Sequence, residues 1–292
     1  MNIKLRTYVY SSFAIAAIEA VLGILCYILF FDVEIGYFND SFFNKIFTAL
    51  IIVSIIAAAI AVKFIVPASE IKEKIAPCKY SAIFPALGYA ISAVFFASVY
   101  VYNHFTNHIQ LAVCLLSIIA AIYYIMKLFD KSAENISAIC GFGAIILNLS
   151  MIFITYTDYA VAMNSPVKIY LHFACAAAAV SVLLELRAIL RTSAKRMRLF
   201  AESVSLILCG VTSVSQLAAC IFGKLDFSYF IIIALSLLGV AVYSAASLLA
   251  ECDSAAASQA SVSNESANDK DIITDEDESD SSITGQKENE EE

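Results

Sequence analysis

The sequence predicts an all-α fold: a polytopic integral membrane bundle of eight transmembrane helices. Three observations predict it. The 292 residues are 61% hydrophobic and only 15% charged, whereas soluble domains carry about 25% charged residues. Eight apolar runs have the length of about 20 residues that a membrane-spanning helix needs. These runs lack the alternating pattern of barrel strands, and lipid leaves exposed backbone groups unsatisfied, so helices are the remaining choice.

The first apolar run, residues 8–31, predicts a retained signal-anchor helix. At about 1.5 Å per residue it reaches about 36 Å, which exceeds a hydrocarbon core of about 30 Å. It is longer than a removable signal segment and does not end in small residues. Seven further spans are predicted at residues 46–66, 80–102, 109–129, 138–156, 167–190, 199–222 and 227–250.

The distribution of lysine and arginine predicts that both termini are cytoplasmic. With the N-terminus inside, 13 cations flank the inner ends of the spans, and only Lys45, Lys168 and Lys224 flank the outer ends. This asymmetry is the positive-inside pattern of membrane proteins. We therefore expect a multi-pass protein of the cell membrane, in contact with the lipid bilayer.

The segment 252–292 predicts a disordered acidic cytoplasmic tail. It holds 13 of the 26 acidic residues and 2 of the 18 basic ones, so the net charge of −8 describes the tail and residues 1–251 are net positive. Its Ser, Ala, Asn, Asp and Glu cannot bury enough apolar surface to offset the entropy of ordering. A basic cytoplasmic protein is the partner that such a tail suits, and no nucleic acid is expected.

The cysteines and the spacing of the spans add two weaker indications. The eight cysteines lie mostly within apolar runs and form no Cys-x-x-Cys pair, which favours buried thiols and predicts no metal or cofactor. Residues 54–58 recur as residues 117–121, and the even-numbered spans begin at similar intervals. Either four parallel helical hairpins are repeated, or short loops alone produce the intervals.

Glu19, near the middle of the first span, is the most informative single residue. A carboxyl at bilayer depth is costly and usually faces a bundle interior or a water-filled cavity. One interpretation is a proton- or cation-responsive group whose charged form is disfavoured by desolvation. The other is a neutral carboxyl that hydrogen-bonds to a neighbouring helix as packing glue. Small and polar residues on the same face predict that Glu19 points toward another helix.

A polar stripe is predicted along one face of the seventh span. Its members recur at helical spacing and are Glu202, Ser205, Cys209, Thr212 and Gln216. Such a stripe suits a hydrophilic pathway, or ordinary hydrogen bonding between helices. Glu202 lies about one turn inside the cytoplasmic end with Arg198 four residues earlier, which predicts an interfacial ion pair.

Asn148, Pro85 and the histidines are further candidates. Asn148 lies in mid-span and is placed to meet Glu19 or Gln216 across the bundle. Pro85, inside the third span, predicts a bend that frees a backbone carbonyl. The histidines fall at the predicted outer side, where they are open to solvation, external-pH sensing or, for the first two if one helix carries both, metal binding; they are His104, His108 and His172.

The sequence carries no P-loop, no Gly-x-Ser-x-Gly and no His-Glu-x-x-His, so no enzyme is predicted. Two hypotheses remain. The first is a transporter or channel for an unknown small solute or ion, with Glu19, Asn148 and the polar stripe lining a polar interior. The second is a non-transporting scaffold or regulatory subunit that binds a partner through the acidic tail. Convergence of Glu19, Asn148 and Gln216 on one cavity would favour transport.

Overall fold

The computed structural model describes residues 2–39, 42–65, 79–129, 134–158, 165–190, 195–225 and 228–276. Within these residues, eight helices are long and apolar enough to cross a membrane, which confirms the predicted class and number. The helices are α1 (Asn2–Phe30), α2 (Phe42–Ile65), α3 (Ile83–Tyr102), α4 (His108–Phe129), α5 (Glu134–Thr157), α6 (Pro166–Leu190), α7 (Lys195–Ile221) and α8 (Tyr229–Glu276). A 3₁₀ turn, Tyr80–Ala82, leads into α3.

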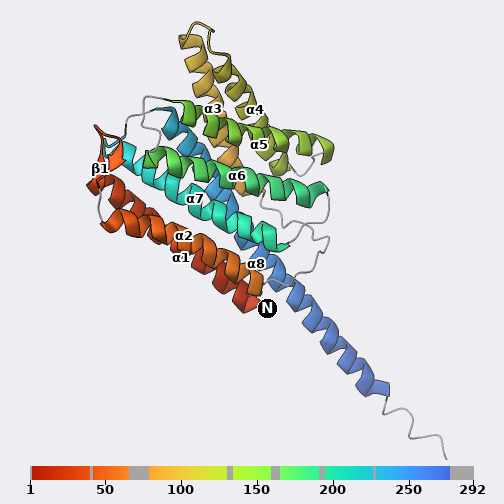
Figure 1. Ribbon diagram of the computed structural model, residues 1–292. Coiled ribbons are helices and arrows are strands. Elements are labelled where there is room, and N and C mark those ends of the chain that lie inside the picture. Colours follow the sequence, from red (N-terminus) through yellow and green to blue (C-terminus); the bar gives the residue numbers. More distant parts are fainter. Residues whose placement is uncertain are drawn as a thin grey trace, which may run out of the picture.

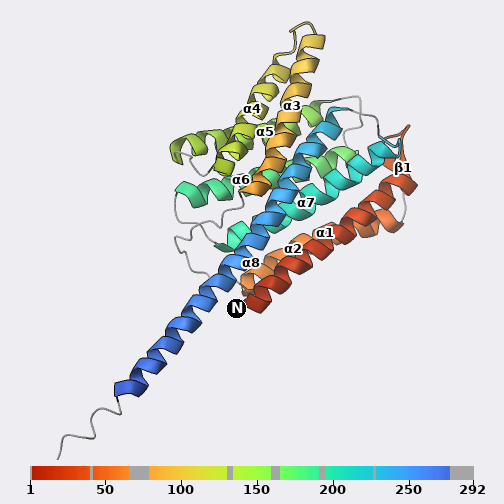
Figure 2. The same ribbon diagram turned by 180° about the vertical axis from the view of Figure 1, so that it is seen from behind.

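Helices α7 and α8 form the centre of the bundle. They pack along each other; α1 contacts both, α3 packs on α8, and α6 contacts both. In the most apolar stretch of each helix, 61% of α7 and 72% of α8 is buried, against 22% of α1 and 28% of α2. The α1–α2 hairpin thus covers the centre from one side and α3–α6 from the other (Figures 1 and 2). This central position explains why α7 carries polar residues: they face protein rather than lipid.

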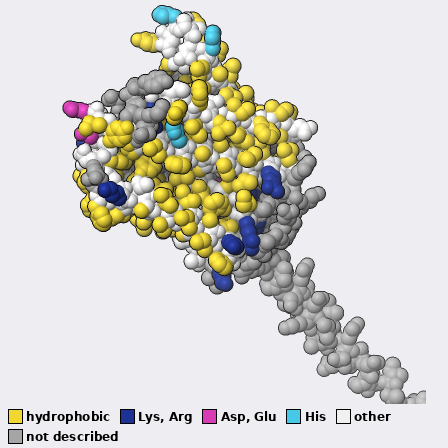
Figure 3. All heavy atoms as spheres, viewed as in Figure 1, with side chains coloured by type: hydrophobic (Ala, Val, Ile, Leu, Met, Phe, Trp, Pro, Cys, Tyr) yellow, Lys and Arg dark blue, Asp and Glu magenta, His cyan; other side chains and the backbone are white. Residues whose placement is uncertain are grey.

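The outer surface of the bundle is apolar, as lipid contact requires. Hydrophobic side chains cover most of the face in Figure 3. A group of basic side chains lies where α8 leaves the bundle (Figure 3). The tip of the α3–α4 hairpin stands apart from the other helices (Figures 1 and 2).

A short β-hairpin joins α1 to α2. Strand β1 (Phe31–Asp32) pairs antiparallel with β2 (Tyr37–Phe38), and the turn places Gly36 at φ +73°. Asp32 Oδ1 accepts backbone N–H bonds from Glu34 (2.9 Å) and Ile35 (3.3 Å). Strands of two residues show no alternating pattern, so the sequence did not predict them. We call this the hairpin end of the bundle, and the opposite end, where α1 begins and α8 leaves, the N-terminal end (Figure 1).

Helix α8 continues beyond the predicted end of the last span. It runs to Glu276 without a break. Starting a helix is the costly step, and the membrane-spanning part of α8 already supplies the first turns. Residues 277–292 lie outside the described residues. The charge pattern still predicts that the N-terminal end is cytoplasmic.

Pro85 lies inside the third span, Tyr80–Tyr102, as predicted, and it falls in the first turn of α3. It is the third residue of α3. A proline is tolerated in a first turn because the backbone N–H groups there have no partner within the helix. Pro85 is buried against α8, where an added Cβ on Gly239 would lie 2.7 Å from Pro85 Cα.

Helices α3 and α8 cross at small residues, which lets their backbones approach closely. An added Cβ on Gly88 would lie 2.7 Å from Ser236 Cα, and one on Gly239 would lie 2.6 Å from the Phe84 carbonyl oxygen. The Ser92 and Ser236 hydroxyls share a hydrogen bond of 2.7 Å at this crossing.

Gly239→Ala is expected to lower the free energy of unfolding by about 1–3 kcal/mol, because the new methyl group meets backbone atoms that cannot move aside cheaply. Unfolding in mixed detergent micelles measures this. Gly210→Ala is the matched control, because its Cβ would lie an ordinary 3.7 Å from Ala241 Cβ. Equal stabilities of the two variants would contradict the close crossing of α3 and α8.

Candidate functional site

Glu19 is a fully buried carboxyl in the least buried helix of the bundle. Its side chain is 0% exposed. Ser54 of α2 donates a hydrogen bond to Glu19 Oε1. Glu19 Oε2 has no hydrogen-bond partner among the described residues, and no described cation pairs with the carboxyl. The predicted placement toward another helix is confirmed, and the carboxyl is held at one oxygen only.

Further buried oxygens without partners lie between α1 and α7 on the hairpin side of Glu19. They belong to Tyr27, Ser215 and Gln216, whose side chains are at most 1% exposed. Gly23, one turn after Glu19, brings Ser215 against the α1 backbone, since an added Cβ there would collide with Ser215 Oγ. We call Glu19, Tyr27, Ser215 and Gln216 the polar seam.

The polar stripe of α7 bonds mainly to the backbone of α6. Cys209 donates to the Ala174 carbonyl (3.3 Å), Thr212 to the Tyr170 carbonyl (3.3 Å) and the Gln216 amide nitrogen to the Val167 carbonyl (2.9 Å). Ser205 Oγ lies 3.6 Å from Cys209 Sγ. These contacts are the interhelical hydrogen bonds that the spacing offered as the alternative to a pathway. Only Gln216 also contributes to the polar seam.

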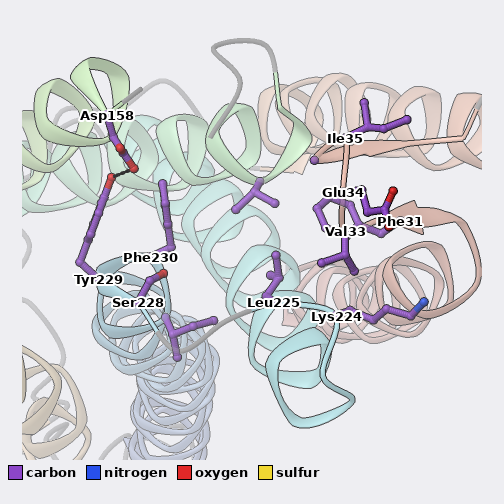
Figure 4. Close-up of a pocket in the computed structure, with 13 residues that line it drawn as sticks. Phe31, Val33, Glu34, Ile35, Asp158, Lys224, Leu225, Ser228, Tyr229 and Phe230 are labelled. Atoms are coloured by element: carbon purple, nitrogen blue, oxygen red, sulfur yellow. Dashed lines mark hydrogen bonds between the residues drawn. The ribbon is translucent and has the colours of Figure 1, made fainter. Parts of the chain in front are cut away.

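A pocket of about 410 Å³ opens at the hairpin end, above the seam (Figure 4). Its lining combines apolar side chains with Glu34, Asp158 and Lys224. Figure 4 shows Asp158 and Tyr229 on one side, where the Tyr229 hydroxyl donates to the Asp158 carboxylate, and Glu34 and Lys224 on the other. Buried Lys168 donates to the backbone oxygen of Asp158 and so secures this rim.

Two residues of the pocket lining touch the polar seam directly. The Val167 carbonyl accepts the hydrogen bond of Gln216. The Phe31 ring packs on the Tyr27 ring, with centroids 5.4 Å apart. The pocket and the seam are therefore separated by the thickness of one layer of side chains.

A buried ion pair joins three helices at the N-terminal end. Lys127 of α4 pairs with Glu185 of α6, and their side chains are 14% and 4% exposed. Glu185 also accepts hydrogen bonds from the hydroxyls of Tyr123 (3.1 Å) and Tyr243 of α8. The Lys127 ammonium lies 4.3 Å from the centroid of the Tyr123 ring. This arrangement satisfies both charges, as a buried pair requires.

A second ion pair lies beside it and replaces the one predicted from sequence. Arg198 pairs with Glu251 of α8, and Lys195 lies 3.3 Å from the same carboxylate. The expected pair of Arg198 with Glu202 is not formed. Both carboxylate oxygens of Glu202 lack a hydrogen bond of standard geometry in the described part of the chain, although the group interacts electrostatically with Glu185, Lys127 and Arg198.

Sequence reasoning missed Glu185, Glu251 and Lys127. The available signal was the one used for Glu19, because Glu185 is also a carboxylate inside an apolar run. Lys127 and the cations near it were read only as topology determinants. Glu251 lies just beyond the predicted end of the last span at residue 250, where a charge is ordinarily solvated.

Asn148 lies away from the polar seam. Its amide nitrogen donates to the Tyr89 hydroxyl of α3 (3.2 Å) and to the Ala144 carbonyl (2.8 Å). Glu19 bonds to α2 and Gln216 to α6, whereas Asn148 joins α5 to α3. The proposed meeting of all three residues is not formed.

The histidines do not share a helix that would present them to one metal ion. Helix α3 ends at Tyr102, His104 lies in the turn at φ 52°, and α4 begins at His108. The described residues contain no group of three or more His, Cys, Asp or Glu placed to hold a metal. His172 Nε2 lies 2.7 Å from the Thr155 hydroxyl.

No protein-family model, curated protein or solved structure matches this chain. The candidate site rests on its own geometry. It consists of a buried carboxyl with one free oxygen, a seam of buried oxygens that leads toward the hairpin end, and a pocket with a charged rim above them.

Proposed function

We propose that this protein moves a small solute or ion across the membrane in a step linked to protonation of Glu19. The observation that carries the proposal is the state of this carboxyl: fully buried, without a described cation partner, and hydrogen-bonded at one oxygen. An unpaired charge at this depth costs several kcal/mol, on the order of 3 by insertion scales. Glu19 therefore binds a proton or a cation while it is buried between the helices.

Packing alone accounts less well for this arrangement. A side chain kept only to join two helices gains most when all its polar atoms are used. Ser54 uses Oε1, but Oε2 has no described partner. The lack of a second bond leaves the carboxyl free to change its proton occupancy without breaking a network.

The α1–α2 hairpin is the part of the bundle best suited to move with that change. Its two helices are the least buried of the eight described spans. Elements with few buried contacts open at the lowest free-energy cost. Protonation removes the charge at the contact of Glu19 with Ser54 of α2, so it biases the hairpin between two positions in the way that a ligand shifts a two-state equilibrium.

The test is solute uptake into proteoliposomes with an imposed pH gradient, using a mixture of small metabolites read by mass spectrometry. Glu19→Gln keeps the size and polarity of the side chain but cannot release a proton. We expect the variant to lose the pH-linked part of uptake, by roughly 10²-fold or more if proton transfer is obligatory.

Ser150→Ala is the control for this experiment. Ser150 is half-buried on α5, and its hydroxyl donates a hydrogen bond within its own helix, to the Ile146 carbonyl. Solute uptake by the Ser150→Ala variant should equal that of the wild type. If Glu19→Gln leaves the pH-linked flux of every responsive solute unchanged, the role of Glu19 is wrong.

A scaffold or regulatory subunit is the second candidate. The observation in its favour is that α8 leaves the bundle and continues as a helix into the acidic segment (Figures 1 and 2). This function requires a basic cytoplasmic protein that co-purifies with the full chain but not with a chain ending at Ser254. It requires no pH-linked uptake, so the experiment above separates the two candidates.

A further inference from the structure

We propose that the polar seam is a proton path that connects Glu19 with the hairpin end of the bundle and not with the N-terminal end. The inference deepens the proposed function, because it names the side from which Glu19 exchanges its proton. It rests on that function only in taking Glu19 as the exchanging group.

The unpartnered oxygens of the seam need partners that the protein alone does not supply. Nearly all buried polar atoms in folded proteins bond to protein or to ordered water. Glu19 Oε2, Tyr27 Oη, Ser215 Oγ and Gln216 Oε1 have no hydrogen bond of standard geometry among the described residues, and the Tyr27 hydroxyl lies beside the Gln216 side chain. Such atoms along α1 and α7 indicate a place where water enters between the helices.

The length of the seam favours a file of water molecules over one bound ion. Glu19 and Tyr27 are eight residues apart, which is about 12 Å along the helix. Oxygen ligands lie about 2.3–2.6 Å from a calcium-sized cation, so ligands of one ion lie within about 5 Å of each other. Hydroxyl groups and waters in a row can instead pass a proton from one oxygen to the next.

The seam ends against the lining of the pocket at the hairpin end. Its last members, Tyr27 and Gln216, contact Phe31 and Val167, and both of these line the pocket. The carboxyl groups of Glu34 and Asp158 lie on the pocket wall, where they can collect protons from the adjoining water. The route from the pocket to Glu19 thus crosses only one layer of side chains before it reaches the seam.

Toward the N-terminal end, the described part of α1 offers no comparable route. The Tyr8 hydroxyl donates to Ser203 Oγ (2.6 Å), and Ser12 donates to the Tyr8 carbonyl (3.0 Å). Between these groups and Glu19 the buried residue on this face is Ala16, at 8% exposed. On the buried face of α1, partnered hydroxyls and Ala16 therefore separate Glu19 from that end.

Charges on the surrounding helices do not approach Glu19 within ion-pairing distance in the described part of the chain. The closest titratable groups on the hairpin side of α1 are Cys26 and Tyr27, and α7 presents Ser215 and Gln216, which are neutral. The described charged groups on α1 and the helices packed against it lie toward the helix ends; they are Lys4, Arg6, Lys45, Lys63, Arg198, Lys195, Arg196, Glu202, Glu251 and Asp253.

A hydrophobic carbodiimide tests the path, because it reacts with the protonated form of a buried carboxyl and leaves a stable N-acylurea. Proteoliposomes are prepared with the pH buffered separately on the two sides, and protease removal of the acidic segment reports their orientation. Labelling of Glu19, read by mass spectrometry, should fall as the pH rises at the hairpin end. It should not respond to the pH at the N-terminal end.

Tyr27→Phe removes the seam hydroxyl but keeps the ring that packs on Phe31, so it should lose the response to pH at the hairpin end. Ser215→Ala provides a second variant if Tyr27→Phe does not fold. Tyr10→Phe is the matched control, since Tyr10 lies on α1 but is 62% exposed, and it should behave as the wild type.

Several outcomes overturn the path. Labelling that follows the pH at the N-terminal end reverses its direction, and labelling independent of pH on both sides, or absent throughout, removes it. If labelling of Tyr27→Phe and of Ser215→Ala both respond to pH as the wild type does, the seam does not carry the proton. These results differ from failure of the proposed function, which appears as pH-linked uptake that survives Glu19→Gln.

Discussion

Lys127→Met is expected to lower the free energy of unfolding by about 3–5 kcal/mol, because it leaves a buried carboxylate without its cation. Glu185 is 3% exposed, and its other described partners are the hydroxyls of Tyr123 and Tyr243. Two neutral hydrogen bonds do not replace an ion pair in a low-dielectric surrounding. Unfolding in mixed micelles of rising denaturing-detergent content measures the loss.

Two comparisons make this result specific to the pair. The double variant Lys127→Met with Glu185→Met should recover most of the loss, since replacing both charges by apolar groups is often neutral or stabilising. Lys63→Met removes an exposed cation of α2 and should change stability by no more than about 0.5 kcal/mol. A Lys127→Met protein as stable as Lys63→Met would show that the pair does not hold the bundle together.

Glu251→Met is expected to produce the second large loss, of about 3 kcal/mol, because Arg198 then remains buried without a carboxylate. Arg198 is 3% exposed, and Glu251 is its one ion-pair partner in the described part of the chain. The loss falls at the low end of the usual range, because a long arginine side chain near a helix end can extend toward the interface. The same micelle unfolding experiment measures it.

Asp253→Asn is the matched control for Glu251→Met. Asp253 is exposed and lies two residues further along α8. Its removal should leave stability within about 0.5 kcal/mol of the wild type. Equal effects of the two substitutions would mean that α8 is not fixed to α7 through Arg198.

Hydropathy and length were sufficient to predict the membrane class and the eight spans, because each span must bury its own backbone hydrogen bonds in lipid. The spacing of polar residues also predicted that Cys209, Thr212 and Gln216 share one face of α7, and all three bond to α6. The β-hairpin at residues 31–38 was not predictable in the same way, since strands of two residues leave no periodic signal.

Partners within the candidate site could not be predicted, because they depend on which helices become neighbours. The depth of Glu19 was evident from its place in the first run, but its bond to Ser54 requires α2 to fold back along α1. Arg198 and Glu202 are one turn apart on α7, yet Arg198 pairs with Glu251 because α8 brings a second carboxylate to the same place. Local spacing shows which residues are adjacent on one helix. It does not show which residue of a neighbouring helix competes for the same partner.

The most direct test of the central claim, that proton exchange at Glu19 is linked to transport, follows proton entry and solute uptake together. Proteoliposomes that contain a pH-sensitive dye receive a solute that the wild type takes up. We expect internal acidification during uptake by the wild type and none with Glu19→Gln. Acidification by Glu19→Gln equal to the wild type, or wild-type uptake with no proton movement, would contradict it.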